Sequence, residues 1–146
     1  PANKLFFVNE GFLRAYYINE NGKEITRMIA WENRFLTNLS SFRSLNENNE
    51  VIESITNAEI LQINRTDFEI LLKSSSNLKS MYADILEEYN AVHIRRFESL
   101  NTFDIEKKFQ HLKDEYPHLI KNLNDKLLAS FLGISRIHYL NNKHLL

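Results

Sequence analysis

Apolar residues in the first part of the chain recur in short runs that are typical of β-strands. Five such runs are separated by turn-forming residues; they are 5–8, 12–18, 23–30, 51–55 and 59–63. Asn19-Glu20-Asn21-Gly22 lies between the second and third runs and predicts a type I′ hairpin turn, because Asn and Gly tolerate positive φ. Residues 31–50, rich in Asn and Ser, predict a short helix and a long loop. Residues 4–72 therefore predict an antiparallel sheet domain.

From Arg65 onward the apolar period becomes helical. Thr66 with Glu69 three residues later predicts a capping box at a helix start. A second helix is predicted from about Ser76 to Phe103, because apolar positions alternate at spacings of four and three; this seam is Leu78, Tyr82, Ile85, Tyr89, Val92 and Arg96. A second stripe lies beside it; it is Met81, Leu86, His93, Phe97 and Leu100.

A helix that is apolar on two sides needs two partners. We therefore expect it to pack against its own sheet and to form a homodimer interface through the seam. The alternative is one broad core stripe in a monomer.

The remaining residues, 104–146, predict a group of shorter helices. Pro117 should bend or break the helical pattern of 104–122. In 125–135, small and apolar residues share one helix face, Gly133 permits a left-handed stop, and Ile134 follows it. This arrangement is typical of the front half of a helix-turn-helix.

The order of these parts resembles the cyclic-AMP receptor protein/FNR family of bacterial transcription regulators, in the branch common in Bacteroidetes-type bacteria. Three segments carry the resemblance; they are 6–24 (Phe6-Phe7-Val8 through Gly22-Lys23-Glu24), 115–119 (Glu115-Tyr116-Pro117) and 128–135 (Leu128-Ala129-Ser130-Phe131-Leu132-Gly133-Ile134-Ser135). The resemblance implies an α+β fold: an antiparallel β-roll of the cyclic-nucleotide-binding jelly-roll type, a long dimerisation helix and a C-terminal helix-turn-helix. It places the β-roll sensor at 1–73, the dimerisation helix at 74–103 and the DNA-binding domain at 104–146.

The resemblance also points to a ligand pocket, from which the chain departs. Family members that bind cyclic AMP carry a motif similar to Phe-x-Gly-Glu in one loop and an Arg later in the chain. The Gly lets backbone amides reach the phosphate, the Arg neutralises the phosphate, and the Glu binds the ribose hydroxyl. The corresponding candidate pocket residues here are Phe35, Thr37, Asn38, Asn48 and Glu50. Thr, Asn and Asn thus replace Gly, Glu and Arg, and Glu50 adds a negative charge. Each lost charge-assisted hydrogen bond is worth roughly 1.5–3 kcal/mol, so we expect no cyclic-AMP binding. Arg34 or Arg43 supplying an anion site by another geometry is the alternative.

The helix-turn-helix departs from the family pattern too. A stretch of that pattern is missing between Ser135 and Arg136, so the domain is expected to be incomplete. The sequence leaves open whether these residues, and any before Pro1, are absent from the protein or only from this sequence. The candidate DNA-binding residues are Ser135, Arg136, His138 and Lys143. Arg136 suits bidentate contact with guanine and Lys143 suits a phosphate, although Arg136 could merely cap a truncated helix.

Composition narrows the classes of function. The chain has 18 Lys and Arg against 19 Asp and Glu, so no global basic field exists; residues 104–146 alone are slightly basic. The absence of cysteine excludes disulfides, thiolate chemistry and the cluster of an FNR-type oxygen sensor. No catalytic motif occurs, and His111 with Glu115 suits a solvated face better than a metal site. We expect no enzyme, no cofactor and no metal.

Neither a signal peptide nor an apolar run of about 18 residues occurs, so the expected protein is cytoplasmic with no membrane partner. The predicted function is a homodimeric transcription regulator that binds double-stranded DNA and has a sensor domain that does not bind cyclic AMP. Whether it binds another small-molecule effector is left open. The alternative is a degenerate sensor-like domain that only dimerises or binds a protein. A third hypothesis is a small-ligand-binding protein without regulation.

Overall fold

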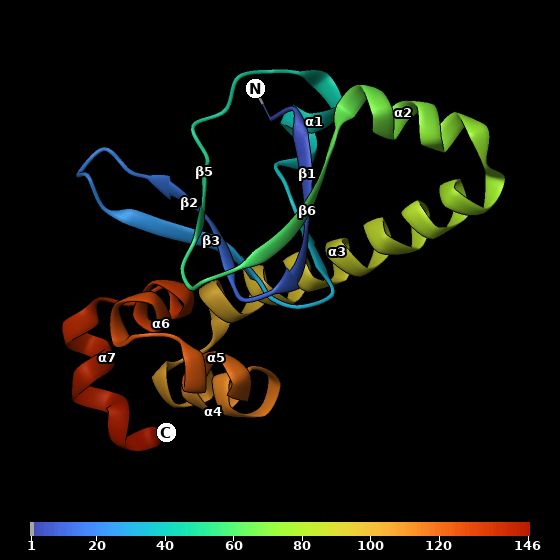
Figure 1. The fold of residues 1–146 in the computed structure, drawn as a ribbon. Helices are drawn as coiled ribbons and strands as arrows, with labels where there is room; N and C mark the ends of the chain where they lie inside the picture. Colours follow the sequence, from blue (N-terminus) through green and yellow to red (C-terminus); the bar gives the residue numbers. More distant parts are fainter. Residues whose placement is uncertain (1) are drawn as a thin grey trace. The chain divides into compact units, whose positions relative to one another are not determined.

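The strands predicted in the first part of the chain form two three-stranded antiparallel sheets in the computed structural model, which describes residues 2–146 (Figure 1). One sheet has the order β4-β1-β6 and the other β3-β2-β5. The strands are β1 (Lys4–Glu10), β2 (Leu13–Ile18), β3 (Glu24–Ala30), β4 (Arg34–Leu36), β5 (Val51–Ser54) and β6 (Glu59–Asn64). All five predicted apolar runs contain a strand, whereas β4 is an additional strand within the predicted loop.

Both sheets contribute side chains to the core of this part. The buried apolar residues of the strands are Leu5, Val8, Leu13, Ala15, Tyr16, Met28, Ile29, Ala30 and Leu36. Arg14 of the central strand β2 is buried as well, and its two terminal nitrogens bind Glu24 (2.7 Å) and Glu53 (3.1 Å) on the flanking strands. This buried cation therefore joins all three strands of its sheet.

The hairpin between β2 and β3 differs from the predicted type I′ turn. Gly22 has a φ of 73°, but Asn21 does not have positive φ as a type I′ turn requires. The backbone N–H of Gly22 donates to the carbonyl of Asn19 (2.9 Å), and the Asn19 side chain accepts from the N–H groups of Asn21 and Lys23. The Asn19 side chain stabilises an ordinary turn closed by one left-handed glycine, so the type I′ prediction is wrong.

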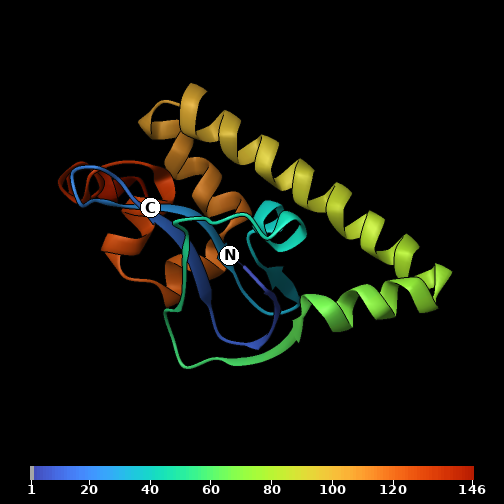
Figure 2. The same ribbon diagram turned by 90° about the horizontal axis from the view of Figure 1, so that it is seen from above.

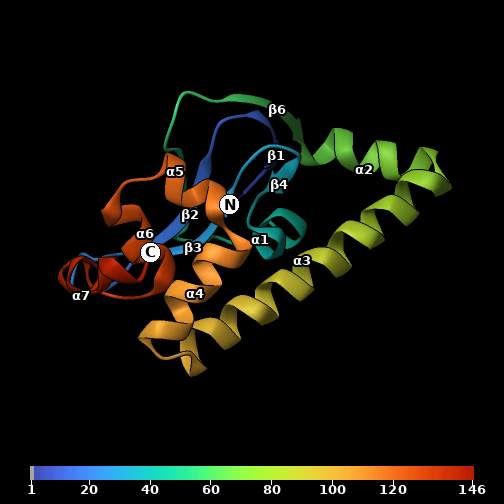
Figure 3. The ribbon, with the colours of Figure 1, turned by 90° about the horizontal axis from the view of Figure 1, so that it is seen from below.

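Three helices follow or interrupt the strands. They are α1 (Leu39–Ser44), α2 (Arg65–Ser74) and the long α3 (Ser76–Thr102). Figure 3 shows α1 following β4, and Figure 2 shows α2 leading into the start of α3. The predicted capping box at Thr66 is wrong: Asn64 caps α2 by accepting from the N–H of Asp67 (2.9 Å), and Glu69 pairs instead with Arg65.

Residues after α3 form four more short helices. They are α4 (Ile105–Glu115), α5 (Pro117–Asn122), α6 (Asp125–Leu132) and α7 (Arg136–Asn142), with a final 3-10 turn at Lys143–Leu145. Pro117 is the first residue of α5, which confirms the predicted break. Their common core contains Phe109, Leu112, Leu119, Leu128 and Tyr139.

The chain forms two compact units, Pro1–Tyr82 and Ala83–Leu146. The division falls within α3, so the boundaries predicted at residues 73 and 103 stay predictions. The predicted α+β class with antiparallel sheets followed by helices is confirmed.

Candidate functional site

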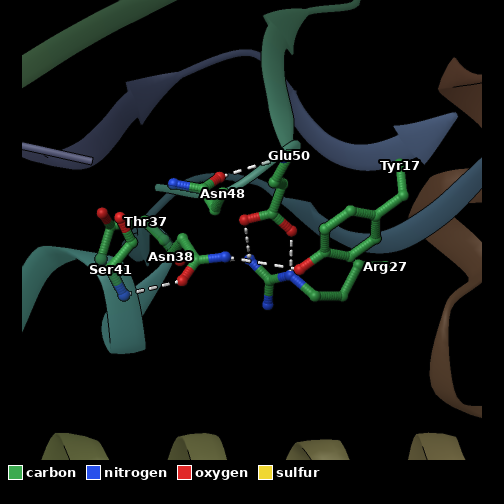
Figure 4. A network of polar contacts seen from close by, with 7 residues as sticks. All are labelled: Tyr17, Arg27, Thr37, Asn38, Ser41, Asn48 and Glu50. Atoms are coloured by element: carbon green, nitrogen blue, oxygen red, sulfur yellow. Dashed lines mark hydrogen bonds and ion pairs between the residues drawn. The ribbon is translucent and has the colours of Figure 1, made fainter. Parts of the chain in front are cut away.

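The predicted ligand-pocket residues lie mainly in a cluster of polar side chains in the first unit. This polar cluster consists of Tyr17 of β2, Arg27 of β3, Asn38 before α1, and Asn48 and Glu50 of the loop before β5 (Figure 4). Local hydrogen bonds hold the loop residues: the side chain of Asn38 accepts from the N–H of Ser41 (3.0 Å), and that of Asn48 accepts from the N–H of Glu50 (3.0 Å). Both asparagines therefore stabilise backbone turns.

An ion pair lies at the centre of the polar cluster. Both oxygens of Glu50 accept hydrogen bonds from Arg27, one from Nε and one from Nη2 (3.2 Å), which is a bidentate contact. The side chain of Glu50 is only 1% exposed, and that of Arg27 is 22% exposed. Arg27 also donates from Nη2 to the carbonyl of Thr37 (3.1 Å). The pair thus joins β3 to the segments on both sides of α1.

Tyr17 and Thr37 complete the surroundings of this pair. The Nδ2 group of Asn38 donates to the hydroxyl of Tyr17 at 3.4 Å. Partial burial, and next the negative charge of Glu50, raise the pKa of Tyr17 above its usual value. The buried hydroxyl of Thr37 donates to the carbonyl of Lys4 (2.8 Å) and so faces β1. At neutral pH, Tyr17 is therefore a neutral group beside the ion pair.

The remaining candidates for this site lie apart from the polar cluster. Phe35 contacts Phe7 with ring centroids 5.0 Å apart, an aromatic pair between β4 and β1. Arg34 stacks over the ring of Trp31 at 4.9 Å. Arg43 lies in α1. The cation of this cluster is therefore Arg27, whereas Arg34 and Arg43, the alternative cations considered from the sequence, lie outside it.

Sequence reasoning missed Arg27 because it lies on a strand that is distant in sequence from the loop. A weak signal was present: Arg27 stands among apolar residues of β3, where a charged side chain needs a partner if it is partly buried. The bulge in β3 at Arg27, where the pairing with β2 passes from Ala15–Met28 to Tyr16–Thr26, could not be predicted from alternation alone.

The predicted DNA-binding residues lie in and beside α7. Helix α6 ends at Gly133, whose φ of 69° is left-handed, and the N–H of Ile134 donates back to the carbonyl of Ala129 (3.0 Å). A Cβ at Gly133 would lie 2.6 Å from the tip of the Leu100 side chain, which would have to shift, and the positive φ itself disfavours any side chain there. Ser135 then caps α7 by accepting from the N–H of His138 (3.1 Å). The three residues Gly133–Ser135 thus form the whole connection between α6 and α7.

The side chains of α7 divide into a buried and an exposed set. Tyr139 is fully buried and stacks on Phe109 of α4, with centroids 5.3 Å apart; burial raises the pKa of Tyr139 to about 12. Arg136 and His138 are exposed, as is Ile137. Lys143 instead binds Asp125 of α6 at 2.8 Å, so its charge is partly neutralised. Of the predicted DNA-binding residues, Arg136 and His138 are therefore the exposed basic side chains outside the Lys143–Asp125 ion pair.

A buried lysine connects the helices of the second unit. The Nζ of Lys108 in α4 donates to the carbonyl of Leu132 at the end of α6 (3.1 Å) and to that of Leu100 in α3 (3.3 Å). Burial, and next the charge of Arg96, lower the pKa of Lys108 below its usual value. A cation at the carbonyl ends of two helices is favourable, and here it holds the end of α6 against α3.

The seam predicted as a dimer interface lies on the more buried side of α3. Tyr89 is buried, and the other five seam residues are intermediate in exposure. Exposed apolar residues of α3 lie elsewhere; the most exposed are Phe97 (71%), Ile94 (59%) and Met81 (51%). The structure holds one chain, so the interface stays a prediction.

Neither a metal cluster nor a membrane-spanning helix occurs in the described part of the chain. Within residues 2–146, no group of three side chains of the types His, Asp or Glu is arranged to hold a metal ion. In the same residues, no helix combines the length and the apolar character that a membrane span requires.

Comparisons with known proteins identify the fold. No family model and no curated protein matches the chain. Solved structures do: FixK2 from Bradyrhizobium japonicum has a TM-score of 0.78 at 12% identity, over 97% of this chain and 75% of its own. The c-di-GMP-responsive global regulator CLP from Xanthomonas campestris has a TM-score of 0.74 at 18% identity, over 99% and 78%. A CRP/FNR-family transcriptional regulator from Thermus thermophilus has a TM-score of 0.70 at 19% identity, over 95% and 72%.

The neighbours of described function are transcription regulators and not enzymes. At such low identity the likeness concerns the fold, and it does not test the Bacteroidetes-type branch. Over nearly its full length, the chain has the α+β fold of CRP/FNR transcription regulators.

Proposed function

We propose that the protein is a homodimeric, DNA-binding transcription regulator whose β-roll does not bind cyclic AMP. The observation that carries the proposal is the fold shared with CRP/FNR regulators over both compact units. The helix pair α6–α7 supports it, because a glycine-containing turn between two short helices is the geometry of a helix-turn-helix.

Helix α7 is the element proposed to enter the major groove. In a helix-turn-helix the second helix presents side chains to base edges. Arg136 lies in its first turn and is exposed, and a guanidinium can bind guanine with two hydrogen bonds. Ser135 caps the helix, so its contribution is to hold α7 in place. His138 lies in the same first turn of α7 and is exposed, as is the neighbouring Ile137.

Replacing Arg136 by alanine is expected to weaken binding to the preferred duplex by roughly five- to 150-fold, because each bidentate contact is worth about 1–3 kcal/mol. Binding to random duplexes should change much less. Lys143→Ala should have a smaller effect on both, since the ion pair with Asp125 partly neutralises Lys143. Fluorescence anisotropy with labelled duplexes at several salt concentrations measures these affinities.

Lys121→Ala at the end of α5 is the matched control for loss of one exposed charge. An equal loss at preferred and random duplexes for Arg136→Ala would reject base reading by α7. No binding of the unmodified chain to any duplex would reject the regulator and favour the alternative, a module that dimerises or binds a protein.

The polar cluster supports the proposed absence of cyclic-AMP binding. Arg27, the cation that a phosphate would need, is already bound on two sides by the carboxylate of Glu50. A phosphate would have to displace that carboxylate or lie beside its negative charge. The side chains of Asn38 and Asn48 are engaged with backbone N–H groups.

Calorimetric titration of the chain with cyclic AMP is therefore expected to show no binding at micromolar concentrations. Glu50→Gln, which removes the competing charge and keeps the shape, should bind the nucleotide at least as well as the unmodified chain. A micromolar dissociation constant for the unmodified chain would overturn this part of the proposal.

A further inference from the structure

A second small site lies in the first unit, apart from the polar cluster. It is a cavity of about 160 Å³, half open to solvent, between α1, α2 and the second turn of α3. Its apolar wall is formed by Phe42, Phe68, Leu72 and Tyr82, and Arg43 and Arg65 line it as well. The function proposed above makes no use of this group of residues.

The apolar wall has the dimensions for one ring. Phe42 and Phe68 meet edge to face with centroids 5.6 Å apart, and Phe68 and Tyr82 do so at 5.1 Å. An apolar protein cavity of about 150 Å³ is large enough to hold one benzene molecule. The cavity is well below the roughly 300–1,000 Å³ of pockets for drug-sized ligands, so its occupant is small.

The charged residues of the cavity favour an anion. The carboxylate of Glu69, which also lines the cavity, is bound by Nε of Arg65 at 2.7 Å. Arg43 is exposed, and the ion pair of Glu69 is made with Arg65 rather than with Arg43. Two guanidinium groups and one carboxylate therefore line the cavity, which gives it a net positive charge.

Arg43 lines the cavity together with Tyr82 and Glu69. Burial raises the pKa of Tyr82, and the charge of Arg43 acts in the opposite direction. Arg43 also contributes, after Arg65 and Lys73, to lowering the pKa of Glu69. The charge of Arg43 therefore acts on both the aromatic wall and the paired carboxylate.

We propose that this cavity binds a small aromatic monocarboxylate, with the ring between Phe68, Leu72 and Tyr82 and the carboxylate on Arg43. The ring contributes burial and edge-to-face contacts, and the carboxylate contributes a charge-assisted hydrogen bond. A neutral ring of the same size loses the second contribution. A dianion meets repulsion from Glu69. The site does not depend on the proposed DNA binding.

Sodium benzoate is the probe, titrated into the full chain and followed by calorimetry and by ligand-detected NMR. Benzyl alcohol, which has the same ring without the charge, is the matched control ligand. Arg43→Gln is expected to weaken benzoate binding by roughly ten- to a hundredfold and to abolish the preference over benzyl alcohol. Leu72→Trp, which fills the cavity, should abolish binding of both ligands.

Arg95→Gln is the control for loss of an exposed arginine in the other unit, and it should leave benzoate binding unchanged. Circular dichroism checks that each variant is folded, and Arg43→Lys, which keeps the charge, should recover part of the affinity. No benzoate binding by the unmodified chain at millimolar ligand overturns the proposal. Equal binding of benzyl alcohol, or undiminished benzoate binding by Arg43→Gln, overturns it too.

Discussion

Replacing Arg27 by glutamine is expected to lower the free energy of unfolding of the first unit by about 3–5 kcal/mol. The side chain of Glu50 is 1% exposed, and Arg27 supplies the opposite charge on both of its oxygens. Removing Arg27 would leave a buried carboxylate without a counter-charge, which is among the most costly changes in a protein. The carbonyl of Thr37 would also lose a hydrogen bond.

Urea denaturation followed by tryptophan fluorescence measures this effect. Trp31 is the single tryptophan of the chain and follows β3, so its signal reports on the first unit. Glu50→Gln should cost less, because Arg27 is partly exposed and can be hydrated. The double variant Arg27→Met with Glu50→Leu should recover much of the loss, since an apolar pair replaces a buried ion pair at little cost.

A loss below about 0.5 kcal/mol for Arg27→Gln, the range of ordinary surface substitutions, would contradict the structural role given to the pair. A double variant less stable than Arg27→Gln alone would contradict it as well. Agreement on both would show that the polar cluster is held by its own charges and needs no bound anion.

The second large effect is expected at the exposed apolar face of α3 formed by Ile94 and Phe97, which we propose as the dimer interface in place of the more buried seam. Ile94→Glu and Phe97→Glu should each raise the dissociation constant of the homodimer by roughly 30-fold or more, as expected for residues central to an interface. These residues are three apart on α3 and therefore share a face; they are 59% and 71% exposed. Because they are exposed in one chain, a charge there should not unfold the protein, whereas it would be buried in a dimer.

Sedimentation velocity over a range of protein concentrations measures the dissociation constants. Arg95→Glu, at an exposed position that the helical period turns away from Ile94 and Phe97, is the matched control and should change association much less. A monomeric unmodified chain at micromolar concentration would reject the dimer. Unchanged association of both variants would place any interface elsewhere, for example at the seam.

The strands and most helices were predictable because their signals are local. Alternating apolar runs, the Pro117 break and Gly133 at the end of α6 all act within a few residues. Cap identity was less predictable: Asn64 and Thr66 are both good caps, and the register of β6 against β1 brings the helix start to Arg65. Strand β4 has three residues, too few for a periodic signal.

The polar cluster was only half predictable. The loop residues Asn38, Asn48 and Glu50 could be placed by resemblance to family motifs, but their partners Arg27 and Tyr17 come from the sheet. Which strand residue meets a loop depends on register, and register here depends on the bulge at Arg27 of β3. Similarly, no local pattern indicates that Lys143 binds Asp125, eighteen positions earlier.

Helix α7 shows what motif spacing alone does not reveal. Ser135 caps a seven-residue helix that begins directly at Arg136, although a stretch of the family pattern is missing there. Tyr139 of this helix is buried against Phe109. The incompleteness of the DNA-binding domain stays a prediction.

Selection from a pool of random DNA duplexes tests the central claim most directly. The full chain is incubated with the pool, bound duplexes are recovered, and their sequences are compared with the input. A homodimer that reads DNA through α7 should enrich a two-fold symmetric motif whose half-sites are about 10 base pairs apart, or a multiple of that spacing. Recovery of sequences no different from the input would contradict a regulator that reads DNA.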